Sequence, residues 1–188
     1  MAAIPEALLR ITAHNTPHYS DPPDAHKFYA ALGMLSVAWG RLEGHAIGNV
    51  ITIMNLLGRG QGKVALFPWD RRIELWNEGF SLLPTLKPHK DHAVTFMQSV
   101  KAAAEDRNFA AHAIWQEFEL NAVEPTMTAR YIREKRGSRG TIEIDDRRVT
   151  LSVVNAALAE CNRLNVEMAE FTKLISPLRP SPAHARRL

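Results

Sequence analysis

The chain is short of the residues and segments on which several classes of protein depend. Cys161 is the only cysteine among 188 residues, which excludes an intrachain disulfide and a cysteine-rich metal site. No apolar run approaches the roughly 18 to 20 residues that cross a bilayer, and Met1–Glu6 has neither a basic nor an apolar signal region. We therefore expect a cytoplasmic protein that does not enter a membrane. Separately, we expect it to use no cofactor.

Basic residues are concentrated in two places, although the net charge is small. The formal net charge is +3, with 23 lysine and arginine residues against 20 aspartate and glutamate residues. The first cluster lies between positions 130 and 148 and the second near the C-terminus: Arg130, Arg133, Lys135, Arg136, Arg139, Arg147 and Arg148, then Arg179, Arg186 and Arg187. These charges predict either a solvated face with a disordered end, which we favour, or a surface that contacts phosphates.

One long amphipathic helix between Ala25 and Leu57 gives the strongest apolar periodicity of the chain. Apolar residues recur there at alternating spacings of three and four: Phe28, Leu32, Leu35, Trp39, Leu42, Ala46, Val50, Ile53 and Leu57. Four glycines interrupt the same helix: Gly33, Gly40, Gly44 and Gly48. Because each glycine costs about 1 kcal/mol relative to alanine, we expect them to serve a close helix–helix contact, which we favour, or a bend.

Further helices follow from prolines, caps and apolar spacing. They are predicted over Pro5–His14, over Phe67–Leu83, from His89 to His112 or Trp115, and from an N-cap at Thr150 to Ile175. The proline-rich end predicts a disordered basic tail over residues 177–188. The length favours a single domain over residues 1–176.

Between the last two helices the pattern changes from helical to extended. Alternation or β-branched enrichment marks three stretches: Gln116–Leu120, Thr126–Glu134 and Thr141–Val149. Gly137 and Gly140 indicate a turn between the last two, and Asp145-Asp146 could form another. The predicted fold is therefore mainly α, a bundle of four to five helices with a small antiparallel hairpin or meander, residues 116–150, inserted before the last helix.

The stretch Glu105–His112 is the part of the chain best suited to chemistry. At about 100° per residue, Glu105, Asn108 and His112 fall on nearly one helix face, and Arg107 lies about 140° from His112. Arginine offers a bidentate fork to a phosphate, and histidine titrates near neutral pH. The trio Arg107, Asn108 and His112 therefore suits phosphodiester chemistry.

The arrangement Arg107-Asn108-x-x-x-His112 near the end of a helix resembles the signature of HEPN domains. These are small helical-bundle proteins, and many are metal-independent ribonucleases of toxin–antitoxin and antiviral systems. Upstream, Trp39-Gly40-Arg41-Leu42-Glu43 is similar to the tryptophan-and-glutamate helix of several bacterial HEPN-like families. The resemblance covers roughly residues 24 to 115 and does not extend over residues 116–150.

The resemblance implies a homodimer in which two motif helices meet across a two-fold axis, so that one cleft holds two histidines and two arginines. In that interpretation His112 acts as base or acid, Arg107 clamps the phosphate, and Asn108 orients the histidine or the phosphate. The RNA product would carry a 2′,3′-cyclic phosphate. We further expect four residues to contact RNA: Arg130, Arg133, Arg136 and Trp115. Glu43 and Glu105 are expected to have structural roles near the site.

Several of these residues also have a structural interpretation. Arg107 could pair with Glu105 or Asp106, and His112 could cap the helix C-terminus. Trp115 is favoured as a core or interface residue over a base-stacking one, and Glu43 as a structural partner for an arginine or histidine within the bundle over a catalytic group. The corresponding function is a non-catalytic HEPN-like module that dimerises, binds RNA or engages an antitoxin-like protein. A third alternative is an accessory subunit of a nucleotidyltransferase.

Overall fold

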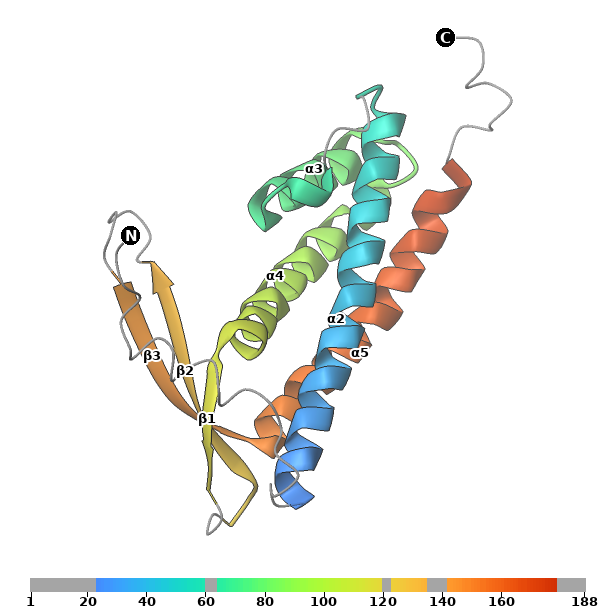
Figure 1. Ribbon diagram of the computed structural model, residues 1–188. Helices are drawn as coiled ribbons and strands as arrows, with labels where there is room; N and C mark the ends of the chain where they lie inside the picture. Colours follow the sequence, from blue (N-terminus) through green and yellow to red (C-terminus); the bar gives the residue numbers. More distant parts are fainter. Residues whose placement is uncertain (1–22, 60–63, 120–122, 135–141, 179–188) are drawn as a thin grey trace. The chain divides into compact units, whose positions relative to one another are not determined.

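The computed structural model describes residues 23–59, 64–119, 123–134 and 142–178 (Figure 1). In these ranges lie the helices α2 (Pro23–Leu56), α3 (Trp69–Leu82), α4 (Lys90–His112) and α5 (Leu151–Ile175), and the strands β1 (Ile114–Phe118), β2 (Thr126–Glu134) and β3 (Ile142–Thr150). The prediction of a mainly helical fold with a small antiparallel sheet before the last helix is confirmed. The predicted helix Pro5–His14 and the tail beyond residue 178 lie outside the described residues.

Helix α2 follows the predicted apolar stripe. Eight of the nine stripe positions lie within it, and all but Leu32 of these eight are buried. The helix ends where Gly58 adopts a φ of 70°, and the N–H groups of Gly58 and Arg59 donate to the carbonyls of Asn55 and Met54. Such a left-handed residue satisfies the last carbonyls of a helix and stops it.

The three strands form one antiparallel sheet in the order β1-β2-β3 (Figure 1). Strand β1 begins at Ile114, because α4 ends at His112 and does not continue to Trp115. All nine residues of β2 pair with β3 in one register, from Thr126 with Thr150 to Glu134 with Ile142. The turn expected at Asp145-Asp146 was wrong: both residues lie within β3.

The described residues form two compact units, and the boundary between them falls within α2, α4 and α5. Unit 1 comprises the described residues among 1–36 and 105–159, and unit 2 those among 37–104 and 160–188. Across both units, no described helix combines the length and apolarity that a bilayer-spanning segment requires.

The core of unit 1 lies against one face of the sheet. Met127, Ala129 and Val149 point to this side, which we call the inner face, and the residues between them point to the outer face. The rest of the core consists of Phe28, Ala31, Ala113 and Val154, with the partly buried Tyr29, Leu32, Phe109, Trp115, Phe118, Tyr131 and Leu151. The sheet is therefore covered on its inner face.

An aromatic cluster fills the core of unit 2. The ring of Trp76 on α3 is fully buried and lies 4.9 Å from Phe80, 6.2 Å from Phe96 and 5.3 Å from Phe171, measured between centroids. Its Nε1 donates to the carbonyl of Ala93 at 3.2 Å. Rings from α3, α4 and α5 thus meet around one tryptophan, whose polar atom is also satisfied.

The glycines of α2 do not make the close helix contact that we expected. A Cβ built at each of Gly33, Gly40, Gly44 and Gly48 has nothing within 4 Å. By contrast, a Cβ at Gly79 of α3 would lie 2.3 Å from Cγ2 of Ile53. In the described part of the chain, the close approach that requires glycine is therefore at Gly79 and not along α2.

We expect Gly44→Ala to raise the free energy of unfolding by about 1 kcal/mol, because alanine favours the helix and its methyl group meets no neighbour. Gly79→Ala should lower it by about 1 to 3 kcal/mol, because the methyl group would clash with Ile53. Urea denaturation followed by circular dichroism measures both changes. A loss of stability in Gly44→Ala would show that this side of α2 is covered in solution.

Candidate functional site

The motif residues lie in the last two turns of α4, within unit 1. Glu105, Asn108 and His112 are all exposed, whereas Arg107 is half-buried. This pattern matches the helical spacing, which sets Arg107 to one side of the stripe that the other three residues form. The stripe faces solvent, and Ala111 beside it is small and exposed.

The motif side chains make few contacts with the described residues. Nη1 of Arg107 donates to Oδ1 of Asn108 at 3.2 Å, and Nε of Arg107 is buried without a partner. Among the described residues, neither an ion pair from Arg107 to Glu105 nor a hydrogen bond from the ring of His112 is present. The imidazole of His112 is therefore open to an incoming group from the side of solvent.

Phe109 fixes this part of α4 to the inner face of the sheet. Its ring lies 6.2 Å from that of Trp115 in β1 and 5.8 Å from that of Tyr131 in β2, both edge-on. The guanidinium of Arg147 in β3 lies over the same ring at 4.5 Å. The pKa of Arg147 is raised, and the charge of Asp106 contributes to that shift after the larger effect of Asp145. Phe109 thus contacts a side chain from each strand.

Trp115 belongs to the core of unit 1. Its Nε1 donates to the carbonyl of Ala110 at 3.1 Å, and its ring lies edge-on to Phe28 at 5.3 Å. Its ring is partly buried between two other rings, and its only donor is satisfied. The structure therefore places Trp115 in packing, beside the motif rather than within a substrate surface.

Two arginines in the described part of the sheet, Arg130 and Arg148, are neutralised by carboxylates. Arg130 donates through Nε and Nη2 to Asp146 at 2.7 and 2.8 Å, and Nε of Arg148 donates to Glu119 at 2.7 Å. The hydrogen bond from Arg130 holds the pKa of Asp146 below its usual range, and that from Arg148 does the same for the pKa of Glu119. These two arginines therefore present less net positive charge than the sequence suggests.

Two further arginines were expected at a phosphate surface, Arg133 and Arg136. The side chain of Arg133 and the whole of Arg136 lie outside the described residues. Of the four expected RNA contacts, the described part of unit 1 therefore brings Arg130 and Trp115 to the sheet, on its outer and inner faces respectively.

Glu43 lies in unit 2, where it partners a buried arginine. Its Oε1 accepts a hydrogen bond at 2.8 Å from Nη1 of Arg72, whose side chain is only 6% exposed. Nη2 of Arg72 donates to the carbonyl of Ala65 at 2.9 Å, and its guanidinium lies 4.8 Å from the ring of Trp69, which in turn meets Trp39 at 5.5 Å. The tryptophan and glutamate of α2 thus form one structural cluster with α3.

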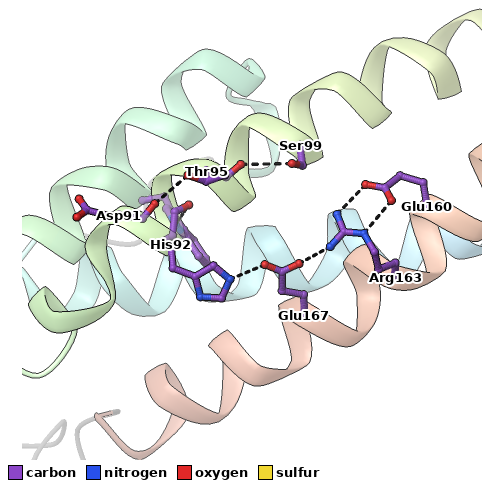
Figure 2. A network of polar contacts seen from close by, with 9 residues as sticks. Asp91, His92, Thr95, Ser99, Glu160, Arg163 and Glu167 are labelled. Carbon is purple, nitrogen blue, oxygen red and sulfur yellow. Dashed lines mark hydrogen bonds and ion pairs between the residues drawn. The ribbon is translucent and has the colours of Figure 1, made fainter.

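A second polar network joins α4 to α5 in unit 2 (Figure 2). Nε2 of His92 lies 2.7 Å from Oε1 of Glu167, and the other oxygen of Glu167 accepts from Nη1 of Arg163 at 2.7 Å. Arg163 also donates to Glu160 at 2.8 Å, and these carboxylates raise its pKa, Glu160 most of all. The helical spacing of Glu160, Arg163 and Glu167 could have revealed the α5 part of this network; the contact to His92 has no local signal.

The described residues contain no group of three or more His, Cys, Asp or Glu side chains that could hold a metal ion. Comparison with protein-family models, with curated proteins and with solved structures gives no match to this chain.

We expect Glu43→Ala to lower the free energy of unfolding by about 3 kcal/mol, because it leaves the buried guanidinium of Arg72 without its counter-charge. Glu74→Ala is the matched control, since Glu74 pairs with the exposed Arg71 and surface pairs contribute little. Thermal and urea denaturation measure both variants. Unchanged stability in Glu43→Ala would remove the structural role of this carboxylate.

Proposed function

We propose that the chain is a HEPN-type, metal-independent RNA endonuclease that works as a homodimer with a composite site. The observation that carries the proposal is the solvent-facing stripe at the end of α4, where Asn108 and His112 lie one turn apart and Arg107 is held beside Asn108. An exposed imidazole with a guanidinium on the same helix end supplies the kinds of donor that phosphate chemistry uses.

Cleavage of RNA without a metal requires three groups. A base must take the proton from the 2′-hydroxyl, an acid must protonate the departing 5′-oxygen, and positive charge must stabilise the phosphorane. One chain offers a single motif histidine, so the second must come from a second copy. A two-fold interface supplies it without a new kind of contact, because the same patch serves both subunits.

In this mechanism His112 of one copy acts as the base and His112 of the other as the acid. Arg107 binds the non-bridging oxygens, and the carboxamide of Asn108 limits the positions that this guanidinium takes. The products are a 2′,3′-cyclic phosphate and a 5′-hydroxyl. Glu43 and Glu105 touch no reacting group in this scheme, and Glu43 acts through the packing of unit 2.

The second candidate is a non-catalytic HEPN-like module that binds a protein partner. The neutralised arginines of the sheet favour it, because Arg130 and Arg148 are already paired with carboxylates and contribute little to a phosphate surface. The partner would then be an antitoxin-like protein that reads the exposed motif stripe. Activity on RNA separates the two candidates.

The test is incubation of the purified protein with mixed RNA in EDTA, followed by analysis of the RNA ends. We expect cleavage that leaves a cyclic phosphate, and a loss of at least about a hundredfold in His112→Ala, since it removes both the acid and the base. Arg107→Ala should reduce cleavage by a similar factor, with Arg107→Lys intermediate because lysine keeps the charge without the fork.

The control variant is His45→Ala, which removes another exposed histidine of the chain. It should cleave RNA like the unchanged protein, and both motif variants should retain wild-type circular dichroism and self-association. Cleavage that survives in His112→Ala excludes the proposed role, and the absence of EDTA-resistant cleavage by the unchanged protein favours the binding module.

A further inference from the structure

Strand β3 is a long and regular edge of the sheet. The described sheet ends at β1 on one side and at β3 on the other. Strand β1 has five residues and an irregular register between Trp115 and Phe118, which shields an edge from further pairing. Strand β3 has nine residues in one unbroken register and contains neither proline nor glycine. Of the two edge strands, β3 is therefore the one whose length and regular register allow another strand to pair with it.

The outer face beside this edge is apolar where β2 and β3 approach their connection. Ile132 and Ile144 are directly paired across the two strands, with exposed fractions of 42% and 59%. Ile142, two residues before Ile144 on the same face, is 66% exposed. Large aliphatic side chains that face solvent, beside an edge that no other described strand pairs with, are typical of a surface that is covered by another chain.

The charges of β3 select the strand that would pair with it. Its acidic residues precede its basic ones: Glu143, Asp145 and Asp146, then Arg147 and Arg148. A parallel copy would set like charges side by side, whereas an antiparallel copy sets the acidic half against the basic half. An edge strand that is protected from pairing carries charges of one sign, which repel a second copy in either direction. Strand β3 instead carries both signs. Within the chain, Asp146 pairs with Arg130 and Arg148 with Glu119, but these two side chains are still 48% and 71% exposed, so a second strand can share them. The order of charges then disfavours a parallel copy and favours an antiparallel one.

We propose that β3 pairs antiparallel with β3 of a second copy of this chain, about a two-fold axis at Asp146 or Arg147. With the axis at Arg147, Asp146 lies directly opposite Arg148 of the second copy; with the axis at Asp146, the two are diagonal, and symmetry repeats the contact in both cases. The residue on the axis meets its own copy, and this like-charge contact is weakest at Arg147, which already pairs with Asp145 within the chain. The two sheets then join into one, and the exposed isoleucines lie on its common outer face.

This interface also brings the two motifs together. A two-fold axis perpendicular to a sheet leaves each residue on its own face, so both copies of Phe109 pack on the common inner face. Phe109 lies against Arg147, which is at or next to the axis. The ends of the two α4 helices therefore flank the axis on the same side. The inference rests on the proposed function only for the choice of a second copy as the partner.

A charge-exchange experiment on the full chain tests the interface. Arg148→Glu makes every charged residue of β3 but Arg147 acidic, and Asp146→Lys makes its centre basic. Each variant alone should self-associate roughly tenfold more weakly at low salt, because it meets like charge twice across the axis. An equimolar mixture should form heterodimers with an affinity near that of the unchanged protein. Sedimentation equilibrium and energy transfer between labelled chains measure these affinities.

Glu119→Lys is the matched control. It breaks the ion pair that Arg148 makes within the chain but leaves the charges of β3 intact, so it should dimerise like the unchanged protein. A readout without substitution is amide hydrogen exchange, in which amides of β3 should gain protection as protein concentration rises while those of β1 do not.

Several results would overturn the interface. The first is an unchanged protein that stays monomeric at all concentrations, as expected if residues 1–22 or a strand of another protein pairs with the edge. The second is single variants that dimerise as tightly as the unchanged protein. The third is a mixture of the two variants that does not recover the affinity of the unchanged protein. None of these measurements depends on RNA. A dimer that responds to the charge-exchange variants but does not cleave RNA would support the β3 interface and exclude the nuclease. RNA cleavage by a dimer that does not respond to these variants would support the nuclease and exclude the β3 interface.

Discussion

The packing of Phe109 on the inner face of the sheet is the contact on which the arrangement of unit 1 depends. The ring meets one side chain from each strand, while its neighbours Asn108 and His112 face solvent. Because a helix fixes successive side chains at steps of about 100°, the ring of Phe109 lies about 100° round the helix from Asn108 and about 60° from His112, and its burial fixes the direction in which both of them point. Aromatic packing thus sets the direction of the polar motif, whose own groups make only one hydrogen bond to the described residues.

The helices could be predicted because an apolar stripe is a local property of the sequence. Helix α2 keeps the expected stripe from Phe28 to Ile53, and its end coincides with a glycine in the left-handed region. The role of the other α2 glycines could not be predicted, since a local helix cost says nothing of what lies opposite. The pair Asp145-Asp146 indicates a turn from the sequence alone for a similar reason: Asp146 is stable within β3 because Arg130 lies directly opposite in β2 and donates to its carboxylate.

The candidate site was only partly predictable. Helical spacing gave the common face of Glu105, Asn108 and His112, because that spacing needs no knowledge of tertiary contacts. The charge of the sheet could not be summed from composition, since a cross-strand register decides which arginines meet carboxylates. In the same way, a buried cationic partner was expected for Glu43, but nothing local singles out Arg72, which lies 29 residues further along the chain.

The junction between α4 and β1 consists of Ala113 alone. This residue is buried, and its N–H donates to the carbonyl of Phe109 at 2.8 Å, so the backbone of His112 is held by a helix before it and a strand after it. A segment tied at both ends has little conformational entropy left to lose when something binds to it. Ligand contact at this imidazole would order little more than two side-chain torsions, and inserting a single residue at the junction would shift the pairing of β1 relative to the end of α4.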